Sequence, residues 1–134
     1  MLKHFRNPKG FTLVEILIVV VMLAILFAIA IPIYTRYVAQ ARAAEAQEAI
    51  NAIKAASNVF NAQTGTWPTN IDQLDQLEFQ DVTKQRWNFN IVSGGQGLSS
   101  ISATSTGRMP GGAGKTVTLN VTTGEWRGYG FDTY

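Results

Sequence analysis

An uncharged apolar run near the N-terminus constrains this chain more than any other feature. Ile16–Ile33 holds eighteen residues without a charge, and only Pro32 interrupts its apolar character. At about 1.5 Å per residue, a helix of this length extends about 27 Å, close to the thickness of a bilayer's hydrocarbon core. Lys3, Arg6 and Lys9 precede the run and are expected to stay in the cytoplasm. The sequence therefore predicts one membrane-spanning helix, with the C-terminal part of the chain outside.

A secretory signal peptide is the first alternative, with Ala28–Ala30 as an A-x-A cleavage site. The apolar run continues past that site through Ile31 and Ile33, and it is longer than the apolar region of a signal peptide needs to be. Glu15 also stands at the start of the run, where a signal peptide has no use for a carboxylate. A retained span explains these features better, although a simple membrane anchor of unrelated function would share them.

Glu15 is the most informative residue in the chain. A carboxylate near the centre of a membrane helix costs about 2.5–3.5 kcal/mol, and less toward the ends of the helix. One interpretation places Glu15 at the membrane interface. The other pairs it with a fixed positive charge, which cleavage after Gly10 would create as the new α-amino group of Phe11. That pair could form within one subunit or between neighbours, where it would set their axial offset.

The sequence around Glu15 resembles a known processing motif. Lys9–Ile18, with the sequence KGFTLVEILI, is similar to the motif of type IV prepilins and of the pseudopilins of type II secretion systems. The resemblance implies that a dedicated peptidase cuts after Gly10 and that the new N-terminal Phe11 is methylated. It also implies that Glu15 guides the assembly of subunits into a filament.

Pro32 is expected to disturb the helix, because it lacks a backbone donor and its ring clashes with the preceding turn. We expect a kink or a local break near Ala28–Pro32. The resemblance implies that the helix bends or melts at Pro32 within a filament. Many members of the family have glycine where Ala24 stands, so extended melting is less expected here.

Beyond Pro32 the sequence predicts a second helical half and then a small sheet. Tyr34–Asn61 is rich in alanine and contains no glycine or proline, and Gly65 is expected to stop the helix. Alternating apolar and polar residues at 87–91 and 117–121 predict antiparallel strands, with a fainter strand at Leu98–Ser105 and a hairpin turn at Thr122–Gly124. Apolar residues at helical spacing give the helix one face to bury. They are Ala46, Ala49, Ile50, Ile53, Ala56 and Phe60.

We therefore expect an α+β fold, in which a long, kinked N-terminal α-helix packs on a small antiparallel β-sheet, as in pilins. Residues 1–10 would be a leader removed by a prepilin peptidase, residues 11–34 a membrane and filament-core helix, and residues 35–134 a globular head. Within the head, the helix would extend to about residue 62, an αβ-loop would cover 63–86, and the sheet would cover 87–134. A short helix capped by Thr69 or Asn70 and ending at Leu77 is expected in the loop.

The composition excludes several kinds of site. The chain has no cysteine, and its one histidine, His4, lies in the predicted leader. Disulfides, thiolate metal sites, and zinc or histidine chemistry in a mature chain are therefore excluded, and we expect no cofactor, no metal and no enzymatic activity. The C-terminal loop would have to rely on packing of Trp126, Tyr129, Phe131 and Tyr134, or on neighbouring subunits. Without the three basic residues of the leader, eight basic and nine acidic side chains remain, so overall charge does not support nucleic-acid binding.

Two local patterns favour simple explanations. Gly111–Thr116 is similar to a phosphate-binding loop, but Met109 stands where that motif needs glycine, and a strand is expected to follow where the motif needs a helix. An acidic run with a spacing of three suits a solvated helix face better than a calcium site. It consists of Asp72, Asp75, Glu78 and Asp81.

The leading functional hypothesis is a structural subunit of a type IV pilus, serving adhesion, motility or DNA uptake. Such a subunit would wait in the bacterial inner membrane as a single-pass precursor and then join an extracellular helical filament of identical copies. Its partners would be a prepilin peptidase and N-methyltransferase, an inner-membrane assembly platform with separate ATPases, and membrane lipid.

Two alternatives stay open. One is a pseudopilin of a type II secretion system. The other is a scarce tip subunit that binds DNA or a surface through a basic patch. That patch would be built from Lys84, Arg86, Arg108, Lys115 and Arg127.

Overall fold

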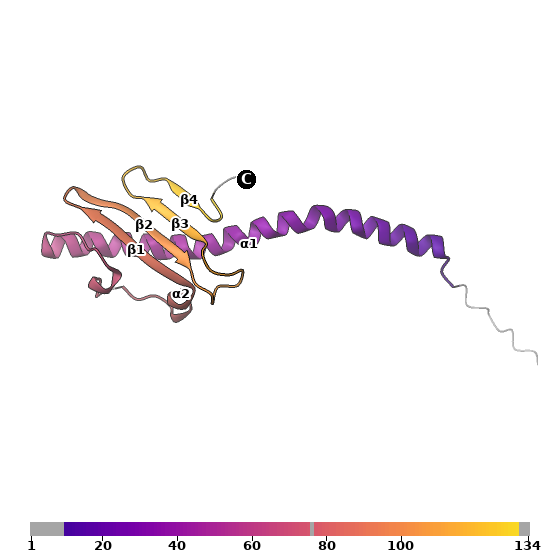
Figure 1. Cartoon of the computed structure of the whole chain (residues 1–134), viewed down its shortest axis with the longest axis horizontal. Helices are drawn as coiled ribbons and strands as arrows, with labels where there is room; N and C mark the ends of the chain where they lie inside the picture. The colour runs from indigo at the N-terminus through magenta and orange to yellow at the C-terminus, as the bar shows by residue number, and fades with distance from the viewer. Residues whose placement is uncertain (1–9, 76, 132–134) are drawn as a thin grey trace, which may run out of the picture. The chain divides into compact units, whose positions relative to one another are not determined.

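The computed structural model describes residues 10–75 and 77–131 (Figure 1). The chain divides into two compact units, Met1–Thr35 and Arg36–Tyr134. Its fold is α+β, as predicted, with one long apolar N-terminal helix and a small antiparallel sheet. Nearly all of the predicted leader lies outside the described residues, so the structure begins at its last residue, Gly10.

The second unit contains the C-terminal half of α1 (Leu13–Thr64) and a four-stranded antiparallel sheet. The strands pair in sequence order and confirm the predicted strands and the turn before the last of them. In the centre of the sheet, Ile101 lies opposite Ile91 on one side and Leu119 on the other, so the apolar side chains share one face. The strands are β1 (Trp87–Gly94), β2 (Gly97–Ser105), β3 (Thr116–Asn120) and β4 (Trp126–Gly128).

The core lies between that face of the sheet and one face of α1 (Figure 1). Four of the predicted helix residues, Ala46, Ala49, Ile50 and Ile53, are buried, whereas Ala56 and Phe60 are half-buried. Ala43 and Ser57 also lie on the buried face. The Ser57 hydroxyl donates to the Ile53 carbonyl at 2.7 Å, which satisfies this polar group inside the core.

Pro32 lies inside α1, which continues through it without interruption. Of the kink or local break predicted near Ala28–Pro32, the break is absent, because the helix is continuous there. A proline removes one bond from the helical ladder, and the apolar residues on both sides keep theirs. The Thr35 hydroxyl also donates to the Pro32 carbonyl at 2.9 Å. Bending or melting within a filament stays a prediction.

The connection between helix and sheet is more structured than predicted. The 3-10 helix η1 (Ile71–Gln73) begins after Asn70, whose side chain caps it as expected, but it ends well before Leu77. A further helix, α2 (Asp81–Arg86), leads directly into β1. The sequence did not predict α2, because its six residues include only one apolar residue, Val82, and so show no apolar periodicity.

Packing closes the C-terminal segment onto the head. The backbone N–H of Tyr129 donates to the Thr116 carbonyl at 2.8 Å, and the Trp126 and Phe131 rings stack with centroids 5.6 Å apart. Packing of these three aromatic residues on the core is confirmed. The fourth residue of the prediction, Tyr134, lies outside the described residues.

Gly130 brings this segment into direct contact with α1. A Cβ atom built on Gly130 would lie 2.5 Å from the Ala43 Cβ and 3.0 Å from the Ala39 carbonyl oxygen, closer than packed atoms approach. The backbone of Gly130 also has a φ of +82°, which favours glycine. The contact therefore depends on small residues on both sides.

We expect Gly130→Ala to lower the free energy of unfolding of the head by about 2–4 kcal/mol, because it adds steric overlap to backbone strain. Gly124→Ala is a matched control: Gly124 has a φ of +76° but nothing within 4 Å of an added Cβ, so it carries only the backbone term of about 1 kcal/mol. Urea unfolding of the full chain in detergent, followed by tryptophan fluorescence, compares the two. Equal losses in both variants would contradict the proposed close contact.

Candidate processing and assembly site

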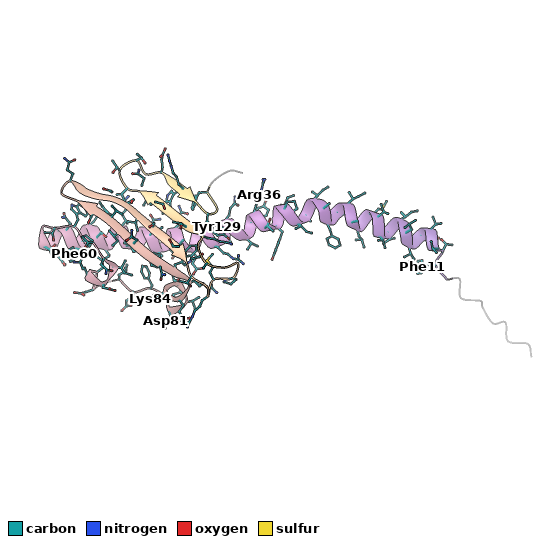
Figure 2. The ribbon with its side chains drawn as sticks, viewed as in Figure 1. Phe11, Arg36, Phe60, Asp81, Lys84 and Tyr129 are labelled. Atoms are coloured by element: carbon teal, nitrogen blue, oxygen red, sulfur yellow. The ribbon has the colours of Figure 1, made fainter. Side chains whose placement is uncertain are left out.

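The Gly10–Phe11 peptide bond lies just ahead of α1. Residues 10–12 have no regular secondary structure, and the helix begins at Leu13. Figure 2 shows Phe11 at the start of the helix, and its side chain is 84% exposed. A Cβ placed on Gly10 would meet nothing within 4 Å. The bond that is predicted to be cleaved therefore lies in exposed, non-helical backbone.

Thr12 and Glu15 form a reciprocal cap at the start of α1. The Thr12 backbone N–H donates to Glu15 Oε2 at 3.1 Å, and the Glu15 backbone N–H donates to Thr12 Oγ1 at 3.2 Å. These bonds satisfy two donors that a helix start leaves without partners. This role of Thr12 was not predicted from the sequence, although a threonine three residues before a glutamate and ahead of an apolar run is the recognisable pattern of such a cap.

The carboxylate of Glu15 has no cationic partner in the described part of the chain. Its Oε2 accepts from the cap, and no hydrogen bond to Oε1 is found among the described residues. The helix N-terminus itself favours a negative charge by about 0.3–1 kcal/mol, well below the cost of burying a carboxylate in an apolar environment. Only one of the two carboxylate oxygens of Glu15 therefore accepts a hydrogen bond from the described residues. Thr12 fixes the position of the side chain, and its charge is available to a partner.

The helix surface around this carboxylate is apolar and uncovered. The large apolar side chains from Phe11 to Ile33 are each at least 45% exposed, and they project outward around the helix (Figure 2). An apolar surface of this extent is covered by lipid or by another protein in any stable state. By length and composition, α1 is the one described helix able to cross a membrane.

Three of the five cations in the predicted basic patch already bind other side chains of the head, two of them carboxylates and one an amide. Arg86 pairs with Glu45 at 3.3 Å and Arg127 pairs with Glu125 at 3.1 Å. Arg108 donates to the side-chain oxygen of Gln85 at 3.1 Å. In the described residues, no group of three or more His, Asp or Glu side chains is placed to hold a metal ion.

We expect Thr12→Ala to weaken the helix start by about 1 kcal/mol, because the Glu15 N–H loses its acceptor. Amide hydrogen exchange of the full chain in detergent micelles measures this change as a roughly fivefold faster exchange at Glu15. Thr12→Ser keeps the hydroxyl and is expected to exchange as the unmodified chain does. If Thr12→Ala leaves that rate unchanged, the cap contributes nothing to the helix start.

The comparisons with known proteins agree with this geometry. Residues 5–31 match the family model described as the prokaryotic N-terminal methylation motif. The chain is 36% identical over 124 residues to the fimbrial protein EcpC of Eikenella corrodens, an alignment that covers 91% of this chain and 78% of that protein. It is 40% identical over 62 residues to a type IV major pilin protein PilE1 of Neisseria gonorrhoeae, covering 46% of this chain and 38% of the relative.

A shorter match joins the chain to a fimbrial protein of Pseudomonas aeruginosa, with 47% identity over 52 residues that cover 39% of this chain and 34% of the relative. The alignments thus cover little more than a third of the Neisseria and Pseudomonas proteins, but most of EcpC. The similarity to EcpC extends over the head as well as the methylation motif. The chain therefore belongs to the family of type IV pilins, the fimbrial proteins.

Proposed function

We propose that this chain is a structural subunit of a type IV pilus, assembled from a precursor held in the inner membrane. One observation carries the proposal: the uncovered apolar half of α1 bears a single carboxylate, Glu15, at its start, fixed in place but without a cationic partner among the described residues. Such a helix is suited to wait in lipid and then to bury its surface against copies of itself. The pilin relatives support a structural role rather than an enzymatic one.

Processing would supply the missing cation. Cleavage after Gly10 leaves an α-amino group on Phe11, and methylation of that amine keeps its positive charge. Glu15 lies one helical turn away, and its Oε1 remains open while Oε2 holds the cap. We propose that the amine of one subunit pairs with the Glu15 of a neighbour, since burial in a bundle makes an unpaired charge costly. The axial offset between subunits would follow from this pair.

The partners of this pathway would be a prepilin peptidase and N-methyltransferase, membrane lipid, and an assembly platform with its own ATPases. The finished filament would lie outside the cell and serve adhesion, motility or DNA uptake. The relatives are fimbrial proteins and pilins, so the type II secretion pseudopilin is not favoured. A tip receptor for DNA gains no support from the head, because two of its five candidate cations are already paired with carboxylates.

Protein sheared from the cell surface is expected to begin at Phe11 and to carry one additional methyl group on that residue. Intact-mass and N-terminal peptide analysis measure both properties in one sample. A chain that begins at Met1, or at Ile31 after cleavage at Ala30, would contradict the proposed processing.

Glu15→Gln and Glu15→Ala separate the charge of Glu15 from its capping role. Glutamine keeps an acceptor for the Thr12 N–H but removes the charge, whereas alanine removes both. We expect both variants to insert into the membrane normally and to reduce filament yield at least about tenfold, because each leaves the neighbour's amine buried without a counter-charge. Membrane fractionation and electron microscopy of sheared filaments provide the two measurements. Normal piliation in Glu15→Gln would mean that the cap, and not the charge, is needed for assembly.

A further inference from the structure

Among its described residues, the head carries charges of opposite sign at its two ends that form no ion pair. Asp75 lines a shallow pocket together with Phe60 and Thr64, at the C-terminal end of α1. Arg42 lies eighteen residues before Phe60 in the same helix, which corresponds to about 27 Å along its axis. Figure 1 agrees: the segment that follows α1 lies near that helix end, and the β2–β3 loop lies at the opposite end of the head. The carboxylates at one end of the head and the cations at the other end therefore cannot reach each other within one chain.

The cationic end is built from Arg42 and Lys115, which meet at Gly111. A Cβ placed on Gly111 would collide with Arg42 Nη1 and lie 3.3 Å from Lys115 Nζ, so the two charged groups approach the same point. Lys115 Nζ donates to the Gly111 carbonyl at 2.6 Å and lies 5.0 Å from the centre of the Tyr129 ring. Neither cation pairs with a carboxylate within residues 10–75 and 77–131. Two like charges this close favour an anion between them.

The backbone beneath these cations is held in place by Ser105, which is buried. Ser105 Oγ donates to the Gly112 carbonyl at 2.9 Å and accepts from the Lys115 backbone N–H at 2.9 Å. Backbone bonds also join Ser105 to Gly114 and Lys115. The glycine-containing loop between β2 and β3 is therefore anchored, and it presents Lys115 beside Arg42 before any partner arrives. An ordered cation pair loses less side-chain entropy on binding than two free lysines would.

The acidic end is also held on ordered backbone. The Asn70 side chain accepts from the Asp72 N–H at 3.2 Å, and Gln73 Oε1 accepts from the Asn70 N–H at 3.2 Å. This reciprocal cap fixes η1, and Asp72 and Asp75 on either side of its end are exposed. Neither carboxylate forms an ion pair with another described residue. Carboxylates are the anions that arginine and lysine bind through charge-assisted hydrogen bonds.

We propose that Asp72 and Asp75 of one copy of this chain bind Arg42 and Lys115 of a second copy, in a head-to-tail contact between subunits of the filament. The inference rests on the proposed function, because it requires copies that lie parallel and staggered along the helix direction. The two complementary patches lie at opposite ends of the head, so the contact is heterologous and can repeat without closing. The copies joined by this contact are offset by about 27 Å along α1. They are therefore a different pair of neighbours from the two that Glu15 joins, whose offset is about one helical turn.

Charge reversal tests the pairing. Lys115→Glu alone and Asp75→Lys alone are each expected to reduce the yield of sheared filaments several-fold and to make the remaining filaments dissociate at lower salt. The double variant Lys115→Glu/Asp75→Lys restores opposite charges between copies and is expected to recover most of the yield. Lys54→Glu is the matched control: Lys54 lies mid-helix without an ion pair in the described chain, and its reversal is not expected to be rescued by Asp75→Lys.

The absence of cysteine from the sequence allows a second test without background. In Lys115→Cys/Asp75→Cys, a disulfide within one chain is geometrically impossible, because the Cα atoms of a disulfide lie within about 7 Å. Mild oxidation of filaments is expected to give a ladder of dimers, trimers and longer chains that reduction abolishes. Lys54→Cys/Asp75→Cys should give no ladder.

The outcomes separate this inference from the proposed function. Suppose that the unmodified chain forms filaments, but the double reversal fails to recover the yield or Lys115→Cys/Asp75→Cys gives no ladder. Either result would overturn the proposed contact and leave the proposed function as a pilus subunit unaffected. Loss of yield in Lys115→Glu without rescue would mean that the cation pair binds another anion, such as a lipid phosphate, and would also overturn the contact. Failure of the unmodified chain to form any filament would instead overturn the proposed function.

Discussion

The apolar surface of α1 between Leu13 and Ile33 has to be covered, and the rest of the molecule depends on how this is done. No residue in that stretch is charged except Glu15, and its side chains are exposed around the helix. In the proposed pathway, lipid covers this surface before assembly, and identical helices cover it after assembly. Both environments exclude water, so each penalises an unpaired charge and neither penalises the apolar side chains. Moving the helix from lipid into a bundle of helices can therefore change the free energy of its apolar surface very little. The free energy of the transfer would then depend mainly on whether the charge of Glu15 finds a partner.

The geometry at the helix start explains how one residue can serve two purposes. Glu15 caps the helix through Oε2 and Thr12, and this hydrogen bond also fixes where the carboxylate lies. A carboxylate held in one position on a helix can pair with a neighbouring chain at only one axial offset, whereas a mobile side chain would allow several offsets. The cap and the proposed ion pair are compatible because they use different oxygens.

Much of this structure is predictable from the sequence, for reasons that can be identified. The buried helix residues Ala46, Ile50 and Ile53 and the strand residues Ile91 and Leu119 follow from periodicity, because burial on one face leaves a repeating pattern. Glu15 stands out because a charge in an apolar run is expensive. The roles of Gly10, Phe11 and Glu15 stay predictions, since a single chain contains neither the peptidase nor a neighbouring subunit.

Other features depend on contacts between distant residues and leave no local pattern. Nothing around Gly130 predicts that it lies on Ala39 and Ala43, some ninety residues earlier in the chain. The short helix α2 has no apolar repeat, and the continuity of α1 at Pro32 depends on the residues around the proline. The meeting of Arg42 with Lys115 likewise requires the fold. By contrast, the Thr12–Glu15 cap was visible in the sequence as a local motif.

The fit of Gly130 against Ala39 and Ala43 has a consequence for how the head matures. A segment that is held by packing, ring stacking and backbone hydrogen bonds, in a chain without cysteine, needs no oxidant and no disulfide isomerase, so the head can reach its final form in a reducing or an oxidising compartment. It also means that the closing segment is attached reversibly. Because β4 is three residues long and lies at an edge of the sheet, we expect the head to open first at this edge when it is heated.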